Sequence, residues 1–491
     1  MTYFLRRLSP SFVICLSLLL FFENASANEF DNLGNSIIGL WQTTLSDNGT
    51  EMMLVLDIQA TDSDSLECTL DLTDFGFLNI PVGKFKLNDG NFTFPGFNAS
   101  YDADDQRITG ILTALGGEVI VEFKRIESKP TFSFEYPEKE VDWILETNSP
   151  IWSSLSVSDG QLIFGNDAGN LYSINMDDLE TSWIFNSESK IRSKALVNDK
   201  LVYFTSDDGY LYSIHSGNGK LNWKVYIGND ASPRNLPALE ASTYDYMCSS
   251  PVIQKGIIYV GSIDSCLYAI NKVNGEIKWK YKTGDIIRST PIVDPGIVYF
   301  GSWDHYMYAI NLKNGTLVWK YDAGERIQST PVIIDNKLIF GSRSASIVGI
   351  DKNTGAELWK TTYWGSWVES SPVIFDGIIY IGSSDFRKVH AIDPENGKVI
   401  WSTRVEAWTW STPAINEEYL FIGGAGTMHR TDVMNTSFYC INRKTGEISW
   451  QVRVAENDDV FIYGFASSAV TWNNWVLFGG IDGKIYGINN N

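Results

Sequence analysis

Cysteine is scarce in this sequence, with five residues in a chain of 491. One of them, Cys15, lies within an N-terminal apolar run, and the others are Cys68, Cys248, Cys266 and Cys440. Cysteines this sparse do not form the disulfide scaffold that stabilises small secreted domains. The expected strand order places Cys248 and Cys266 two strands apart, about 10 Å at the usual strand spacing, which is beyond disulfide reach. We therefore expect free thiols.

Histidine is also scarce. The four histidines are His215, His305, His390 and His429. They lie far apart and lack the spacing of metal ligands. The sequence also lacks a Gly-x-Ser-x-Gly nucleophile turn, a phosphate-binding loop and a zinc-binding helix motif. No hydrolytic, phosphate-binding or zinc chemistry is therefore indicated by a motif, and we predict no catalytic residue and no metal site.

Basic residues are outnumbered by acidic ones. The chain has 38 Lys and Arg against 59 Asp and Glu, which gives a net charge of −21. Such a chain repels the phosphates of nucleic acids and the anionic surface of membranes. We expect no nucleic-acid partner, and we interpret the charge mainly as a determinant of solubility.

Long hydrophobic runs are missing as well. The N-terminal apolar run, Phe12 to Phe22, is too short to span a bilayer. Arg6 and Arg7 precede it and Ala25-Ser26-Ala27 follows, which predicts a secretory signal peptide over residues 1–27. An uncleaved anchor is the alternative. After cleavage we expect an exported protein, periplasmic or extracellular, that is not integral to the membrane.

Short strands and tight turns are abundant. Aromatic residues make up 13% of the chain and there are 41 glycines, a composition that suits short strands joined by turns. Residues 34–127 predict a small meander barrel or sandwich of seven or eight strands. The expected strands are Ile37–Leu45, Glu51–Gln59, Leu66–Leu72, Ile80–Leu87, Asn91–Phe94, Ile108–Leu112 and Val119–Ile126. Residues 128–140, with two prolines and mixed charge, predict a linker.

The first domain resembles a lipocalin-like barrel. Its motifs are Gly39-Leu40-Trp41, Leu54–Ile58, Leu70-Asp71, Ile80-Pro81-Val82 and Phe123-Lys124-Arg125. The resemblance implies that the early Trp packs near the late Arg at one end of the barrel. It is closer still to a lipocalin-like domain found ahead of secreted hydrolases. The barrel could hold a small apolar ligand or be filled with side chains, and we favour the filled barrel.

Residues 141–491 contain eight copies of one repeat. A Tyr-x-Ile-like phrase ends at Ile174, Ile214, Ile270, Ile310, Ile350, Ile392, Ile441 and Ile488. A tryptophan follows seven of these phrases, at Trp183, Trp223, Trp279, Trp319, Trp359, Trp401 and Trp450. The eighth copy lacks its last strand, and an orphan copy of that strand surrounds Trp143. A ring explains both facts, because the N-terminal strand then completes the last blade and hides the free edges. We predict an all-β protein: a small barrel followed by an eight-bladed β-propeller with four-stranded blades.

Two kinds of repeated residue have a structural interpretation. Aspartates recur in the turn between the second and third strands, at Asp207, Asp264, Asp304, Asp385 and Asp482. We expect these carboxylates to bond their own backbone, as Asp does in turns, and not to bind metal. The tryptophans of the last strands are expected to pack between adjacent blades, because burying an indole ring gives a large apolar gain.

The tryptophan phrase resembles the propeller repeats named for pyrroloquinoline quinone. The resemblance implies one of two branches: quinoprotein dehydrogenases, which bind the quinone and calcium, or non-catalytic propellers such as the one in the outer-membrane β-barrel assembly machinery. The dehydrogenases carry a vicinal cysteine pair, and this sequence has none. No Asp or Glu can be assigned as the base by motif. We therefore expect no cofactor, with quinone and calcium only under the dehydrogenase alternative.

The mouth of the central channel is the candidate binding surface. Residues just before the Ser/Thr-Pro of each first strand should lie there, and aromatic residues gather in the neighbouring connections. The candidates are Arg192, Arg288, Gln328, Trp364, Trp367, Glu369, Trp408 and Trp410. An exposed aromatic cluster would suit a protein or a glycan, whereas rings that fill space between blades are the alternative. The insertion 230–247 is a second candidate, as a recognition loop or a cap on the channel.

These observations favour a non-catalytic binding or scaffold protein of the cell envelope, with envelope proteins as partners. A quinone-dependent dehydrogenase is the enzyme alternative. A carbohydrate-binding or small-ligand-binding protein that uses the barrel or the aromatic mouth is the third.

Overall fold

The computed structural model describes residues 32–61, 65–75, 77–94, 96–114, 117–131, 134–228, 245–426, 436–454 and 462–489. The chain divides into two compact units, residues 1–134 with 362–366 and residues 135–361 with 367–491. The predicted signal peptide and most of the 230–247 insertion lie outside the described residues. No helix in the described part of the chain has the length and apolarity needed to cross a membrane.

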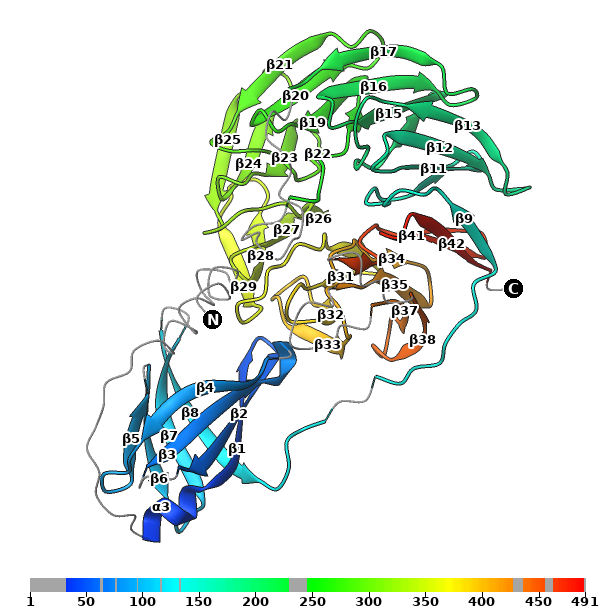
Figure 1. The fold of residues 1–491 in the computed structure, drawn as a ribbon. Helices are drawn as coiled ribbons and strands as arrows, with labels where there is room; N and C mark the ends of the chain where they lie inside the picture. The colour runs from blue at the N-terminus through cyan, green and yellow to red at the C-terminus, as the bar shows by residue number, and fades with distance from the viewer. Residues whose placement is uncertain are drawn as a thin grey trace. The chain divides into compact units, whose positions relative to one another are not determined.

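The first unit contains an eight-stranded antiparallel sheet that curls into a near-closed barrel (Figure 1). In sheet order its strands are β4 (Phe77–Phe85), β3 (Leu66–Leu72), β2 (Thr50–Ala60), β1 (Gly39–Asp47), β8 (Gly117–Ile126), β7 (Arg107–Ala114), β6 (Phe97–Asp102) and β5 (Asn91–Phe94). A short helix, α3 (Asn32–Ile37), precedes the sheet, and a 3-10 turn (Thr73–Phe75) follows β3. Both α3 and β6 were missing from the expected elements. Strand β6 is only six residues long, although its alternating burial is the pattern of a half-buried strand.

Aromatic side chains fill the interior of the barrel. Phe85, Phe92 and Phe94 contact one another with ring centroids 4.9–5.6 Å apart, and all three are buried. The guanidinium of Arg125 lies 5.3 Å from the centre of the Trp41 ring, and Trp41 Nε1 donates to the carbonyl of Ile37 at 2.8 Å. The predicted Trp–Arg pair is therefore present, and the packed phenylalanines favour the filled barrel over the hollow one.

The second unit is an eight-bladed propeller in which every blade is a four-stranded antiparallel sheet. Blade 1 consists of β10 (Ser156–Ser158), β11 (Gln161–Gly165), β12 (Asn170–Asn175) and β13 (Thr181–Asn186), and blade 2 of β14 (Leu196–Asn198), β15 (Leu201–Thr205), β16 (Tyr210–His215) and β17 (Leu221–Tyr226). Blade 3 consists of β18 (Val252–Gln254), β19 (Ile257–Gly261), β20 (Cys266–Asn271) and β21 (Ile277–Lys282), and blade 4 of β22 (Ile292–Asp294), β23 (Ile297–Gly301), β24 (Tyr306–Asn311) and β25 (Leu317–Asp322). In each blade we call the strands A to D, from the channel outward.

The last four blades follow the same plan. Blade 5 consists of β26 (Val332–Ile334), β27 (Lys337–Ser342), β28 (Ser346–Asp351) and β29 (Glu357–Thr362), and blade 6 of β30 (Val373–Phe375), β31 (Ile378–Gly382), β32 (Lys388–Ile392) and β33 (Val399–Arg404). Blade 7 consists of β34 (Ala414–Ile415), β35 (Tyr419–Gly423), β37 (Ser437–Asn442) and β38 (Ile448–Arg453), and blade 8 of β40 (Val470–Trp472), β41 (Trp475–Gly479), β42 (Lys484–Asn489) and β9 (Trp143–Glu146). A two-stranded ribbon joins β36 (Ala425–Gly426) to β39 (Tyr463–Gly464). Figure 1 shows β9 beside β42, so the predicted closure of the ring is confirmed.

The repeated tryptophans join each blade to the next one. Trp223 on β17 donates from Nε1 to the carbonyl of Lys272 in the next blade. Its ring lies so close to Gly275 that a Cβ added to this glycine would be 2.9 Å from the Trp223 Cε3 atom. Blades 2 to 7 have glycine in the turn between strands C and D because a side chain there would collide with the tryptophan of the preceding blade. The same indole-to-carbonyl bond is made by Trp183, Trp279, Trp319, Trp359 and Trp401.

The two blades beside the chain closure depart from this pattern. Blade 1 has Leu179, at φ +60°, where the other turns have glycine, and Trp143 and Leu179 pack against the same apolar cluster. Blade 8 has no turn between its last two strands because they come from opposite ends of the chain. Trp450 accordingly packs beside Phe421 and Phe438.

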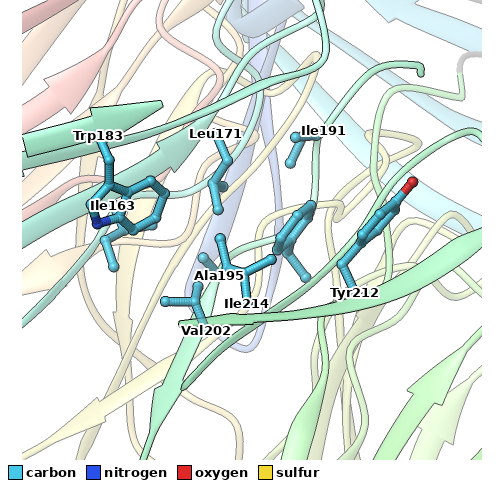
Figure 2. Packing of buried hydrophobic residues seen from close by; sticks show 9 residues of the cluster. Ile163, Leu171, Trp183, Ile191, Ala195, Val202, Tyr212 and Ile214 are labelled. Atoms are coloured by element: carbon cyan, nitrogen blue, oxygen red, sulfur yellow. The ribbon is translucent and has the colours of Figure 1, made fainter. Parts of the chain in front are cut away.

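The core of the propeller lies between the blades. Figure 2 shows one such cluster, in which side chains of the first blade meet those of the second. The labelled residues are Ile163, Leu171, Trp183, Ile191, Ala195, Val202, Tyr212 and Ile214. All of them are buried, so each blade is stabilised mainly by apolar contact with its neighbours.

Three of the five predicted turn aspartates act as expected. Asp264 accepts the backbone N–H of Cys266 at 3.0 Å and the hydroxyl of Tyr268 at 2.6 Å. Asp304 and Asp482 do the same in their blades, but in blade 2 the residue in this role is Asp208 rather than Asp207. Among the described residues, no group of three or more His, Cys, Asp or Glu could hold a metal. Cys68, Cys248, Cys266 and Cys440 are free thiols.

Candidate functional site

A short phrase repeated in every blade builds the channel end of the propeller. Its central residue is a serine, such as Ser249, whose Oγ accepts the N–H of Gly261 at 2.9 Å and so fixes the start of strand A to the end of strand B. In six other blades the serine accepts the same bond from a backbone N–H that lies 12 residues further along the chain. These serines are Ser153, Ser193, Ser329, Ser370, Ser411 and Ser467. The serine therefore holds its two chain neighbours in equivalent positions around the ring.

The residue before each serine belongs to what we call the mouth ring. Its members are Trp152, Arg192, Cys248, Arg288, Gln328, Glu369, Trp410 and Ala466. The residue after each serine belongs to the hydroxyl ring, which consists of Ser154, Lys194, Ser250, Thr290, Thr330, Ser371, Thr412 and Ser468. All eight members of the hydroxyl ring and five members of the mouth ring border a cavity of about 440 Å³ in the propeller.

Tyr246 is inserted among the side chains of the mouth ring. Its ring stacks on Trp410 with centroids 4.6 Å apart and lies 5.7 Å from the ring of Trp152. Its hydroxyl donates to Glu369, and its carbonyl accepts a bond from Arg192 at 3.3 Å. Burial raises the pKa of Tyr246 well above its usual value, and the charge of Glu369 adds to that effect. The described end of the insertion therefore caps the mouth ring. A cap on the channel was one of the two roles predicted for this insertion, the other being a recognition loop.

The arginines of the mouth are paired with carboxylates. Arg192 makes a two-pronged contact with Asp167, at 2.8 and 2.6 Å. Arg288 contacts Asp245, the neighbour of Tyr246, through Nε at 2.7 Å and through a second guanidinium nitrogen. Buried pairs of this kind are costly to break, because removal of one partner leaves an uncompensated charge.

Glu369 accepts hydrogen bonds from three side chains at the mouth. It accepts bonds from Gln328 at 2.8 Å and from Arg343 Nε at 2.6 Å, as well as from the hydroxyl of Tyr246. The guanidinium of Arg343 in turn lies 4.4 Å from the centre of the Trp367 ring. A chain of contacts thus links Trp367 to Tyr246 through two charged side chains.

Three of the four aromatic candidates, Trp364, Trp408 and Trp410, are buried, and Trp367 is half-buried. Trp408 stacks on Trp410 at 4.9 Å, and the two side chains are 3% and 2% exposed. The expectation of an exposed aromatic cluster is therefore not met for this pair, because Tyr246 covers Trp410 and Ala425 packs against the same cluster. Trp364 falls in residues 362–366, which group with the first unit, so it is not part of the mouth.

Sequence reasoning missed three kinds of residue here. Asp167 and Arg343 lie on loops outside the repeated phrase, and only the fold shows which mouth residue they reach. Tyr246 belongs to the insertion, which was singled out only as a whole. The hydroxyl ring could have been found, because its residue follows the mouth residue by two positions in every repeat and is Ser or Thr in all but Lys194.

The quinone and calcium of the quinoprotein branch do not fit this mouth. The carboxylates of Asp167, Asp245 and Glu369 are each bound by an arginine, so these oxygens are not free to form a calcium ligand set. Tyr246 already occupies the face of Trp410 on which a planar ring could stack. We derive no reaction step through either group.

The family of the propeller follows from comparison with known proteins. Residues 135–244, 245–366 and 343–491 match the family described as outer membrane protein assembly factor BamB. The chain belongs to this BamB family. No curated protein sequence matches the chain.

Solved structures show the same BamB-type fold. BamB from Moraxella catarrhalis is 17% identical, with a TM-score of 0.54 over 71% of this chain and 99% of that one. The computationally designed Ika8 protein is 14% identical, with a TM-score of 0.55 over 70% and 97%. Quinohemoprotein alcohol dehydrogenase from Comamonas testosteroni is 12% identical, with a TM-score of 0.55 over 71% and 76%. At these identities the likeness concerns the fold alone.

Proposed function

We propose that this protein is an exported, non-catalytic BamB-type propeller that acts as a protein-binding scaffold in the cell envelope. Membership of a family described as an outer membrane protein assembly factor supports the location and the role. The pairing of the acidic groups at the mouth weakens the dehydrogenase alternative, because a general base must be free to accept a proton from its substrate.

The binding surface that we propose is the outer rim of blades 2, 3 and 4. The observation that carries it is a row of exposed apolar side chains at equivalent positions of three consecutive outer strands. Leu221, Ile277 and Leu317 are 50%, 40% and 44% exposed, and each pairs with the isoleucine that ends its neighbouring strand C. Val273 and Val318 extend this rim patch and are also exposed. Large exposed apolar patches mark interaction sites, and we propose that these side chains form one.

The outer strands add a second element of recognition. Strands β17, β21 and β25 are the outer edges of their blades, so one side of each backbone has no partner within its sheet. A partner that presents an extended segment can pair with such an edge while its apolar side chains cover the rim patch. The repeated geometry would give a partner up to three equivalent positions.

A pull-down from an envelope extract tests the proposal. The bait is the full chain after signal cleavage, and the test variant changes Leu221, Ile277 and Leu317 to serine together. We expect the wild type to retain one or more envelope proteins that the rim variant loses. Exposed substitutions change stability by only about 0.5 kcal/mol each, so thermal unfolding should confirm that the variant is folded.

The matched control changes three exposed isoleucines on the outer strands of other blades to serine: Ile144, Ile184 and Ile400. This variant should retain the same proteins as the wild type. Equal losses in both variants, or retention of nothing above background by the wild type, would contradict the proposal. A rise in thermal midpoint that appears only when the quinone and calcium are added together would instead support the dehydrogenase.

A further inference from the structure

The hydroxyl ring supplies hydrogen-bond donors to the cavity. Ser250 Oγ accepts the backbone N–H of Lys194 at 2.9 Å, and Thr290 Oγ1 accepts the N–H of Ser250 at 3.0 Å. Ser371 and Ser468 accept the N–H of Thr330 and of Thr412 in the same way. Each bond links the ring residue of one blade to that of the next.

These bonds determine what the hydroxyls can still do. A hydroxyl has one hydrogen to donate and two lone pairs, and the backbone N–H uses a lone pair. The hydrogens of Ser250, Thr290, Ser371 and Ser468 remain, and no described residue accepts them. The cavity wall can therefore offer four O–H donors to a ligand.

Lys194 replaces the hydroxyl in one blade and adds a positive charge to the same ring. Its side chain borders the cavity, and among the described residues it has no carboxylate partner. The Lys194 side chain is accessible to solvent, and it borders the cavity. The surrounding protein still removes part of the water around the ammonium, and this desolvation lowers the pKa of Lys194. An unpaired ammonium at such a place is stabilised by a bound anion.

The cavity also has an apolar part. Trp152, Trp410 and Met247 border it near the mouth ring, and Val373 and Ile415 border it along strands A. The volume of about 440 Å³ lies within the range of small-molecule sites. Apolar walls with a few convergent polar groups are the usual composition of such sites.

We propose that the channel binds a small organic anion, a carboxylate or phosphate ester with an apolar or aromatic body, whose oxygens accept bonds from Lys194 and the hydroxyl ring. This inference does not depend on the scaffold function, because the rim patch and the cavity use different residues. The net charge of −21 opposes the approach of an anion, so the local donors must supply the binding energy.

Binding of benzoate and phenyl phosphate to the full chain tests this inference, with benzyl alcohol as the neutral ligand of similar shape. Tryptophan fluorescence reports binding, because Trp152 and Trp410 border the cavity, and calorimetry gives the stoichiometry. We expect saturable binding of at least one anion at one site per chain and no binding of benzyl alcohol. Absence of saturation by both anions up to about 10 mM, weaker than any useful affinity, would overturn the inference and leave water as the acceptor.

Two variants identify the role of Lys194. Lys194→Met should weaken anion binding by roughly ten-fold or more, the usual value of a charge-assisted hydrogen bond, whereas Lys194→Arg should retain it. Lys313→Met removes a lysine on an exposed turn of blade 4 and should change nothing. Unchanged binding by Lys194→Met would overturn the inference.

The pH dependence gives a readout that a structural role of Lys194 would not produce. Only the protonated amine attracts an anion, and its pKa is lowered. Wild-type binding should therefore fall at a pH below that of an ordinary lysine, while Lys194→Arg should bind at higher pH. Identical pH profiles for the two proteins would contradict the role assigned to Lys194.

Discussion

Tyr246 lies flat against Trp410, with 20° between the planes of the two rings. The same tyrosine donates its hydroxyl to Glu369. One side chain from an insertion thus connects an apolar stack to a buried charge network. Removal of its hydroxyl and removal of its ring should therefore lower the stability of the propeller by separate amounts.

The first prediction separates the hydroxyl of Tyr246 from its ring. Tyr246→Phe keeps the stack and should cost about 1.5–3 kcal/mol, the value of a hydrogen bond to a charged group. Tyr246→Ala also removes the ring and should cost about 3–5 kcal/mol. Urea unfolding followed by tryptophan fluorescence measures both. Tyr226→Phe, at a half-exposed tyrosine, is the control and should be neutral. A Tyr246→Phe variant as stable as the wild type would contradict the hydroxyl contact.

The second prediction concerns the buried charge of Glu369. Arg343→Met leaves this carboxylate without its cation and should destabilise the propeller by about 3–5 kcal/mol. Glu369→Gln in the same chain removes the unpaired charge, so the double variant should be more stable than Arg343→Met alone. A double-mutant cycle of unfolding free energies measures the coupling. Additive effects would show that the two side chains do not interact.

The third prediction tests the contact between tryptophan and glycine of adjacent blades. Gly275 and Gly256 both have positive φ, +72° and +79°. A Cβ at residue 275 would meet the ring of Trp223, whereas one at residue 256 meets nothing within 4 Å. Gly256→Ala should cost only the backbone strain of about 1–2 kcal/mol, and Gly275→Ala should cost about 1–3 kcal/mol more. Equal thermal midpoints of the two variants would refute the docking role.

The fourth prediction concerns pH. Burial, with a smaller contribution from the charge of Lys388, lowers the pKa of His390 from 6.5 to about 3. The unfolded chain therefore binds a proton below pH 6.5 that the folded chain does not, and stability is lost as the pH falls from 6.5 towards 3. The loss is about 1.4 kcal/mol per pH unit.

The matched variant for this prediction is His390→Val, because Val348 occupies the equivalent position of blade 5. Unfolding free energies at pH 7.5 and pH 5 should differ less in the variant than in the wild type. The same pH dependence in both proteins would show that another group titrates.

The repeat made the propeller predictable from the sequence. Trp223 and Gly275 recur at fixed spacing, and a missing last strand together with an orphan first strand around Trp143 is explained only by a closed ring. The interpretation of the glycine was incomplete, because spacing along one chain does not show that Gly275 faces the tryptophan of the preceding blade. That contact exists only after two blades have packed.

The mouth was less predictable for the same reason. Arg288 and Glu369 were identified as mouth residues, but their partner Asp245 belongs to the insertion, and their partner Arg343 lies in a turn between strands B and C whose residues vary from blade to blade. The aromatic residues were expected at the surface because a sequence does not record which ring covers another. Helix α3 was missed because it is short and has only two apolar residues, and strand β6 was missed because it is short.

The pairing of β9 with β42 has a consequence for the order in which the protein is made. Asp142 beside β9 accepts the backbone N–H of Asn489, 347 residues later in the chain. The outermost strand of the eighth blade is thus synthesised first among the propeller strands, and its partner is synthesised last. During synthesis β9 has no partner strand until β42 has been translated, so the ring can close only after that point.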